Sequence, residues 1–259
     1  MLAATRAVLA AGSLTLALCG ASSAFAGDQG AVAPVAGTIV FSGSDYKDSS
    51  NFSYLGAVHA FNGNLGTDGL LVRIFGGFGS YDYDTPAVPG GNVDTDLFAG
   101  DLTIGYQTFG SGLRVSGYIG VSYENHDRSP EDPGNVVQGD EVGFKGILEL
   151  ETLENSPIYF GAIGGYSTGF DSYWARGRIG ANVGRGIVIG PEIIGLGNEG
   201  FDQVRYGAFI SGLPSLMSLV FGGDGKMSVS VGYADSAVGG SGQGGDDSVY
   251  GSIGSSFTF

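Results

Sequence analysis

The chain has 259 residues, of which 50 are glycine, 12% are aromatic and only 14% are charged, and its formal net charge is −15. Nucleic-acid phosphates would repel so acidic a chain, and we therefore expect no nucleic-acid partner. Glycine and aromatic residues in short alternating segments, without the period of collagen, are typical of an all-β protein with many tight turns.

Residues 1–26 have the features of a secretory signal peptide. Arg6 precedes a weakly apolar run, AVLAAGSLTLALCGASS, and AFA at 24–26 fits a small-x-small cleavage site. The apolar run is short for a membrane span. A lipoprotein signal is disfavoured because Leu18, rather than a small residue, precedes Cys19. Cleavage after Ala26 removes the one cysteine and leaves no disulfide. We expect residues 27–36 to form a flexible lead.

Beyond this signal, no apolar run is long enough for a membrane-spanning helix. Large apolar and polar residues alternate instead. From Phe98 to Tyr106 the large apolar side chains fall at even positions, while Asp101 and Thr103 fall at odd ones. Soluble sandwiches also alternate, but these segments run about ten residues or more, the length that a tilted strand needs to cross hydrocarbon. In an exported chain, this pattern indicates an outer-membrane β-barrel.

The alternation predicts a single all-β domain at residues 37–259, an antiparallel up-and-down transmembrane β-barrel of about 12 strands. One stretch is ambiguous: LPSLMSLVF, within 213–225, fits a thirteenth short strand, part of a neighbouring strand or an amphipathic turn, so the count ranges over roughly 10 to 14. The predicted strands lie at residues 38–46, 52–63, 69–82, 96–109, 112–125, 139–152, 157–168, 172–184, 187–197, 203–211, 226–235 and 249–259.

The connections fall into two groups. Most of those after odd-numbered strands are long, acidic or rich in Gly and Pro, such as TPAVPGGNVDT and NHDRSPEDPGNVVQ, while most after even-numbered strands are tight, such as GSG and GRG. Outer-membrane barrels have longer outer loops and short periplasmic turns. The first group is therefore predicted to face outward, with both chain termini on the periplasmic side.

The polar side of each strand is predicted to face the lumen, since a charge on the lipid side costs about 2–4 kcal/mol near the midplane. Two interpretations of the lumen stay open. Paired charges fill the interior in one, and a hydrated pore selects solutes in the other; a barrel of about 12 strands lies between the filled and the open sizes. The candidate lumen-lining charges are Arg73, Asp101, Arg114, Glu141, Lys145, Glu149, Glu151, Arg176, Arg178, Glu192 and Arg205.

The chain offers little for catalysis or metal binding. A hydrolase needs a nucleophile beside a histidine. The two histidines are His59, at an interface-like strand position, and His126, in a predicted outer loop, and no GxSxG motif occurs. Carboxylates in EDPGNVVQGDE and GGDD match no calcium-loop motif. We therefore expect no enzyme, no catalytic residue, no metal and no cofactor.

Aromatic residues cluster near predicted strand ends. They fit the aromatic girdle at the two membrane interfaces, and as an alternative they fit stacking against sugar rings. The residues concerned are Tyr81, Tyr83, Tyr159, Tyr166, Tyr173 and Trp174.

The final segment, VYGSIGSSFTF, alternates up to its last residue. Phe257 and Phe259 share the apolar side, as the lipid face of a barrel-closing strand requires. The segment resembles the signal that the barrel-assembly machinery reads in outer-membrane proteins. We expect outer-membrane lipid and that machinery as partners.

Five blocks in order, GLLVRIFGGFGSYDYDT, YENHDRSPEDPGN, GFKGILELET, SYWARGRIG and GNEGFDQVRYGAF, resemble the cellulose biosynthesis protein BcsS family of alphaproteobacteria. The resemblance covers roughly residues 52–212 and brings no catalytic residues. It implies an exported accessory of cellulose secretion, with cellulose and its secretion proteins as partners. Candidate outer-loop contacts within these blocks are Asn125, His126, Asp127, Asp132, Asn198, Glu199 and Asp202.

We therefore expect a non-enzymatic barrel in the outer membrane of a Gram-negative bacterium that assists cellulose biosynthesis or secretion. Cellulose is neutral, so a lumen of mixed charge would not attract it, and a scaffold role is at least as well supported as a conduit. The alternatives are a small porin for other solutes and an outer-membrane lipid or glycan hydrolase.

Overall fold

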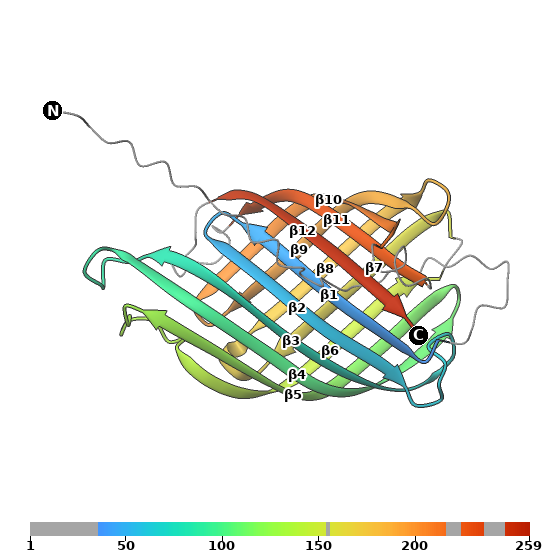
Figure 1. The fold of residues 1–259 in the computed structure, drawn as a ribbon, viewed down its shortest axis with the longest axis horizontal. Coiled ribbons are helices and arrows are strands. Elements are labelled where there is room, and N and C mark those ends of the chain that lie inside the picture. Colours follow the sequence, from blue (N-terminus) through green and yellow to red (C-terminus); the bar gives the residue numbers. More distant parts are fainter. Residues whose placement is uncertain (1–35, 154–155, 216–223, 236–246) are drawn as a thin grey trace, which may run out of the picture.

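A computed structural model describes residues 36–153, 156–215, 224–235 and 247–259. Twelve antiparallel strands form a closed barrel in which each strand pairs with its neighbours in sequence and β1 pairs with β12 (Figure 1). The strands are β1 Thr38–Lys47, β2 Ser50–Ala60, β3 Gly69–Asp84, β4 Asn92–Gly110, β5 Leu113–Ser129, β6 Gly139–Thr152, β7 Ile158–Ser167, β8 Tyr173–Asn182, β9 Val188–Asn198, β10 Phe201–Pro214, β11 Asp224–Asp235 and β12 Ser248–Thr258.

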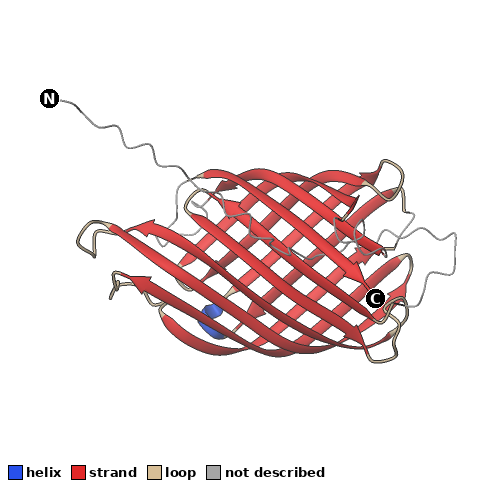
Figure 2. Ribbon diagram, viewed as in Figure 1, coloured by secondary structure: helices blue, strands red, loops and turns tan. Residues whose placement is uncertain are grey.

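The predicted fold class and the twelve strands are confirmed, with ends that shift by a few residues. A short 3₁₀ helix, η1 (Gly169–Asp171), lies between β7 and β8 (Figure 2). In the part of the chain that the structure describes, no helix is long and apolar enough to cross a membrane. The predicted signal peptide and nearly all of the lead lie outside the described residues.

The barrel closes through β1 and β12. Their register runs from Ile39 opposite Thr258 to Lys47 opposite Tyr250. Phe259 continues the pairing, because its carbonyl accepts from the Gly37 amide at 2.8 Å and its amide donates to the Thr38 carbonyl at 2.9 Å. Closure leaves no unpaired edge, which a barrel in hydrocarbon requires.

The two ends of the barrel differ in their connections. We call the end with connections 85–91, 130–138 and 168–172 the loop end, and the opposite end, with connections 61–68, 111–112 and 183–187, the turn end. In Figure 1 the loop end lies on the left, where β3, β4 and β5 extend furthest. These are the longest strands, at 16, 19 and 17 residues, and they exceed the roughly 9–11 residues that a membrane crossing needs.

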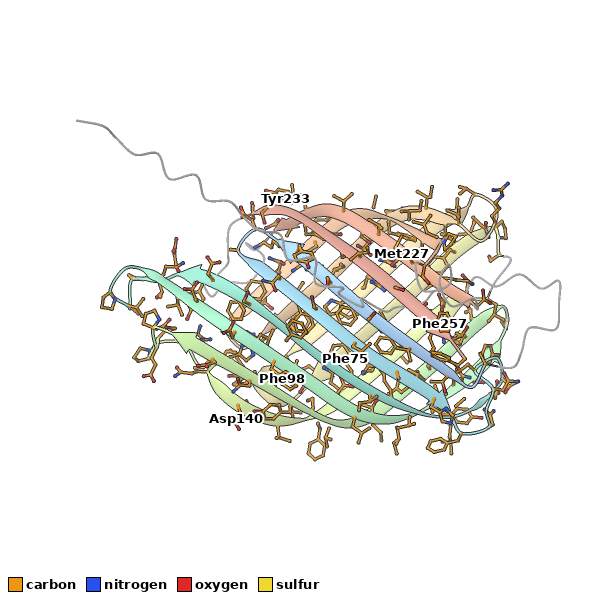
Figure 3. The ribbon with its side chains drawn as sticks, in the orientation of Figure 1. Phe75, Phe98, Asp140, Met227, Tyr233 and Phe257 are labelled. Atoms are coloured by element: carbon orange, nitrogen blue, oxygen red, sulfur yellow. The ribbon has the colours of Figure 1, made fainter. Side chains whose placement is uncertain are left out.

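Most strands, as in β3 to β6, carry their apolar side on the outer face of the barrel, where side chains such as Phe98 project (Figure 3). Charged side chains on this face gather near the loop end, as at Asp96 of β4 and Asp140 of β6. On the same outer face, slightly further from the loop end, the rings of Phe98 and Tyr123 lie 6.1 Å apart. Exposed large hydrophobic residues of the strands include Leu55, Leu70, Ile74, Phe78, Leu102, Ile104, Tyr106, Ile119, Val121, Val142, Phe144, Leu148, Ile158, Ile179, Ile193, Tyr206, Val231, Val249 and Ile253.

The stretch predicted as ambiguous begins inside β10. Leu213 and Pro214 still pair with β11, after a register shift that follows Ile210. Gly212 occupies this bulge with a φ of +79°, and a Cβ there would lie 2.0 Å from the Gly186 carbonyl oxygen. The bulge therefore requires glycine. Residues 216–223, where a thirteenth strand was considered, lie outside the described residues.

Candidate functional site

The inward-facing side chains of the strands enclose a cavity of about 460 Å³. Residues from all twelve strands line it, which places it on the barrel axis. Its lining extends from Leu65 at the turn end to Val137 at the loop end. The interior of the barrel is thus the site at which the predicted lumen charges meet.

Ion pairs link neighbouring strands across the interior. Arg73 of β3 pairs with Asp101 of β4, and its guanidinium lies 5.1 Å from the centroid of the Phe75 ring. Arg114 of β5 lies 3.0 Å from the Glu151 carboxylate of β6. Each pair joins adjacent strands, so these charges hold the wall together as well as occupying the lumen.

Glu192 of β9 collects a second group of partners. Arg178 of β8 donates to its carboxylate, and Arg176 Nε lies 3.9 Å from it. The Tyr250 hydroxyl of β12 donates to Glu192 Oε1 at 3.0 Å. Ser230 of β11 accepts from Arg178 at 2.9 Å and so closes the network. Partners from β8, β11 and β12 thus converge on one buried carboxylate of β9 and compensate its negative charge.

All eleven predicted lumen charges lie on the interior side of their strands, but the prediction was incomplete. Asp45 of β1 pairs with Arg205 of β10, although 160 residues separate them. Glu124 and Arg128 of β5 are also buried in the interior. The alternation that identified Arg114 reaches both β5 residues when it is carried ten to fourteen positions further along the strand.

A hydrophobic cluster fills the turn end of the interior. The connection 61–68 folds inward, so that Leu65 is only 3% exposed and packs within the cluster. Gln107 holds it there, because its side-chain amide donates to the carbonyls of Leu65 at 2.9 Å and Thr67 at 2.7 Å. The cluster consists of Ile39, Phe41, Val58, Ala60, Leu65, Leu71, Tyr118 and Ile147.

The loop end is narrowed by its own connections. Val88 packs against Tyr83 and Val93, and Phe170 of η1 is buried against His126, with ring centroids 5.1 Å apart. The 130–138 connection crosses toward the β9–β10 hairpin, since a Cβ on Gly200 would lie 3.6 Å from a Val137 methyl. Side chains therefore fill the turn end and narrow the loop end, to which the cavity still extends.

The predicted outer-loop contacts require a correction. His126 lies within β5 and faces the interior, while Asn125 and Asp127 flank it on the same strand. This end of β5 extends beyond the band of exposed apolar side chains on the outer face, so both sides of the strand are polar. The sequence of this segment therefore resembles that of a loop. Asn198 ends β9 and Asp202 lies in β10, which leaves Asp132 and Glu199 as the two that lie in connections.

The clustered aromatic residues divide between the two faces. Tyr166 and Tyr173 are exposed on the outer face, as a girdle requires. Tyr81, Tyr83 and Trp174 line the interior cavity instead. The exposed tyrosines are therefore candidates for the aromatic girdle, and the aromatic residues of the cavity are candidates for stacking against sugar rings.

The two histidines occupy opposite faces of the barrel. His59 is exposed on β2 and shares a hydrogen bond of 2.9 Å with the Thr38 hydroxyl. His126 is inside, where a 3.0 Å hydrogen bond joins its Nδ1 to the Tyr81 hydroxyl. The Glu124 carboxylate lies 3.9 Å from the other ring nitrogen of His126, Nε2. Within the described ranges, no three His, Cys, Asp or Glu side chains form a group that could hold a metal ion.

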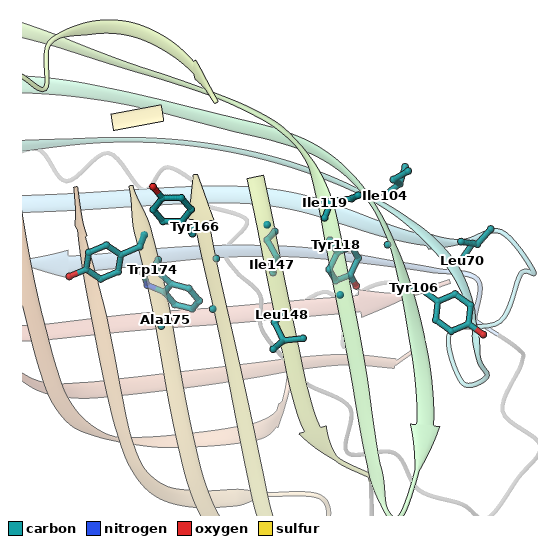
Figure 4. A pocket seen from close by; sticks show the side chains of 16 residues that line it. Leu70, Ile104, Tyr106, Tyr118, Ile119, Ile147, Leu148, Tyr166, Trp174 and Ala175 are labelled. Carbon is teal, nitrogen blue, oxygen red and sulfur yellow. The ribbon is translucent and has the colours of Figure 1, made fainter. Parts of the chain in front are cut away.

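The outer wall carries a recess of about 790 Å³ across β3 to β8 (Figure 4). Gly117, Gly146 and Gly164 form part of its floor, and a Cβ added at the first two would meet no atom within 4 Å. Its rim includes Ile119 and Leu148. The recess opens on the outer face of the barrel, among the exposed apolar side chains, and its own lining is apolar.

Comparisons with known proteins give one family and several barrels. The model of the family described as cellulose biosynthesis protein BcsS matches residues 39–259. No curated protein sequence gives a significant match. Among solved structures, the chain is similar to the KdgM porin in complex with disordered oligogalacturonate, at 10% identity and a TM-score of 0.42, over 85% of this chain and 99% of that one.

Two further solved structures give similar values. The transport unit of the autotransporter AIDA-I from Escherichia coli has 10% identity and a TM-score of 0.47, over 94% of this chain and 95% of that one. The TodX deltaS2S3 mutant monoaromatic hydrocarbon channel has 10% identity and a TM-score of 0.48, over 88% and 91%.

Proposed function

Because the chain belongs to the BcsS family of cellulose biosynthesis proteins, we propose that it is a non-enzymatic outer-membrane barrel that supports cellulose secretion as an anchor or scaffold. Its partners are outer-membrane lipid and proteins of the cellulose-secretion apparatus. The loop end faces outward, and the turn end faces the periplasm.

The exterior supports a membrane location. Leu148 is 61% exposed at the middle of β6, and most strands present similar apolar side chains outward. Water would make such a surface costly, at roughly 25 cal/mol per Å² of apolar area. Lipid removes that cost, and the closed backbone pairing satisfies the second requirement of hydrocarbon.

The side chains in the interior of the barrel favour a scaffold role over a conduit for cellulose. A glucan chain that threads the barrel needs a continuous opening, whereas the Leu65 cluster occupies the turn end and folded connections narrow the loop end. Ion pairs between them would also have to break. A barrel with this interior serves better as a membrane anchor that presents its surfaces to other proteins.

Deletion of the gene, with secreted cellulose as the measurement, tests the family-based role. We expect cellulose to fall, and complementation with the wild-type gene to restore it. A second complementation uses a His59→Ala, His126→Ala double variant, which we expect to restore cellulose equally. Unchanged cellulose after deletion would refute the proposed role, and failure of the double variant alone would revive a hydrolase.

Single-channel recording of the purified barrel in a planar bilayer separates the scaffold from a small porin. We expect no steady current from the wild-type protein at moderate voltage. A constant open-pore current would contradict the filled interior and favour the porin, for which the cavity of about 460 Å³ is the supporting observation.

A further inference from the structure

Arg128 stands out among the interior arginines. It lies on β5, is 7% exposed and lines the loop end of the cavity. Each of the other interior arginines, Arg73, Arg114, Arg176, Arg178 and Arg205, has a carboxylate within 4 Å. Among the described residues, Arg128 has none.

The donors of Arg128 lack acceptors as well. In the described parts of the chain, no hydrogen-bond acceptor faces its buried Nε and Nη1 atoms. The guanidinium carbon lies 5.6 Å from the centroid of the Tyr83 ring. A desolvated cation–π contact contributes on the order of 2 kcal/mol, whereas a buried charge loses several kcal/mol of solvation. The ring therefore compensates the charge only in part.

The nearby carboxylates already serve other groups. Asp132 accepts from the Tyr83 hydroxyl at 3.0 Å and from the Gly134 amide at 3.0 Å. Glu124 accepts from the Ser172 hydroxyl and lies 3.9 Å from His126 Nε2. Neither reaches Arg128, so the charge of the guanidinium remains available to a group from outside the chain.

His126 adds a second polar atom to the same face. It precedes Arg128 by two residues, which places both side chains on the interior side of β5, about 7 Å apart along the strand. The residue is 3% exposed, and its Nε2 makes no hydrogen bond within the described residues. Its Nδ1 is fixed by the Tyr81 hydroxyl.

Aromatic faces border these donors. The rings of Tyr81 and Tyr83 are stacked, with centroids 6.3 Å apart and an angle of 26° between their planes, and both line the cavity. Tyrosine pairs an apolar ring face with a polar tip, which suits the C–H face of a pyranose. The planar fork of arginine suits carboxylate and phosphate oxygens.

We propose that Arg128 and His126 form a site at the loop end of the lumen for the carboxylate or phosphate group of an acidic sugar that enters from outside the cell. A lipid headgroup has the same anionic chemistry, but it lies around the barrel wall and not inside it. The site takes a ligand different from neutral cellulose and does not depend on the proposed scaffold role, although entry from outside the cell rests on the proposed orientation of the loop end.

Calorimetric titration of the full-length barrel in detergent tests the site with four probes: glucuronate, glucose 6-phosphate, glucose and inorganic phosphate. We expect both acidic sugars to bind and glucose not to bind. Arg128→Met, which keeps the length of the side chain and removes its charge, should weaken binding about tenfold or more. The matched control is Arg185→Met, since Arg185 is exposed in the 183–187 connection at the turn end.

The resistance of each variant to urea distinguishes a ligand site from a structural role. Without any probe, Arg128→Met should be at least as stable as the wild type, because it removes an uncompensated buried charge. Absence of binding by the wild type, or equal binding by Arg128→Met, would overturn the site. If inorganic phosphate binds as tightly as glucose 6-phosphate, the binding is adventitious anion binding, and the proposal that the site recognises a sugar is refuted. If Arg128→Met is less stable than the wild type, Arg128 stabilises the fold, and the proposal that its charge is available to a ligand is refuted.

Discussion

Glu192 shows how one interior residue stabilises several strands. Its carboxylate is the shared partner of Arg176, Arg178 and Tyr250. Removal of an acid from such a buried group leaves positive charges without compensation, and the cost is therefore larger than the strength of any single bond.

We predict that Glu192→Ala lowers the free energy of unfolding by about 3–5 kcal/mol. Urea titration of the refolded barrel in detergent, followed by tryptophan fluorescence from Trp174, measures the change. Glu199→Ala is the matched control, because Glu199 is exposed in the β9–β10 turn and its loss should be nearly neutral. Equal stability of the two variants would contradict a central role for the Glu192 network.

The interior pairs also show where prediction from sequence reaches its limit. Arg178 lies directly opposite Glu192 in the β8–β9 register, and Arg114 lies opposite Glu151, so a correct hairpin register would find both pairs. The pair of Arg205 with Asp45 crosses the lumen between strands that are not neighbours. Alternation assigns a face to each side chain, but it carries no information on distances across the interior.

Single strands were more predictable than single contacts. Alternation of period two identified all twelve, because each must place apolar residues toward one side along its whole membrane crossing. The rule fails where a strand leaves the belt. β5 continues to Ser129, and there both faces are polar, so the segment around His126 was predicted as a loop.

The bulge in β10 gives a test at the scale of an element. We predict that Gly212→Ala lowers the free energy of unfolding by at least about 1–3 kcal/mol, since a positive φ is unfavourable for alanine and the new Cβ would approach Gly186. Gly110→Ala, at the end of β4, has open space for a Cβ and serves as the control. Urea titration compares them, and a stable Gly212→Ala barrel would show that the bulge relaxes freely.

The inward fold of residues 61–68 gives a second test at this scale. We predict that Leu65→Ser and Gln107→Ala together raise the single-channel conductance, because they remove the anchored plug from the turn end. Phe61→Ala changes an exposed side chain of the same connection and should leave conductance unchanged. If the double variant conducts no better than Phe61→Ala, this connection does not block the lumen.

At the scale of the whole molecule, the outer surface divides into an apolar belt and an acidic margin at the loop end. Leu148 and Asp140 lie on the same outward side of β6, eight residues apart. If lipid surrounds the belt, a charge at these two positions must have very different costs. The depth dependence distinguishes a membrane barrel from a soluble barrel with an apolar coat.

We predict that Leu148→Arg reduces the folded fraction in lipid vesicles by an amount equivalent to about 2–4 kcal/mol, while Asp140→Arg costs about 0–1 kcal/mol. Folded barrels resist unfolding in cold detergent gels, so the shift in electrophoretic mobility between heated and unheated samples measures this fraction. Repetition in detergent micelles, which adapt to a surface charge, should narrow the difference. Equal folding of both variants in vesicles would mean that lipid does not cover β6 at Leu148, and the proposed membrane placement would have to be abandoned.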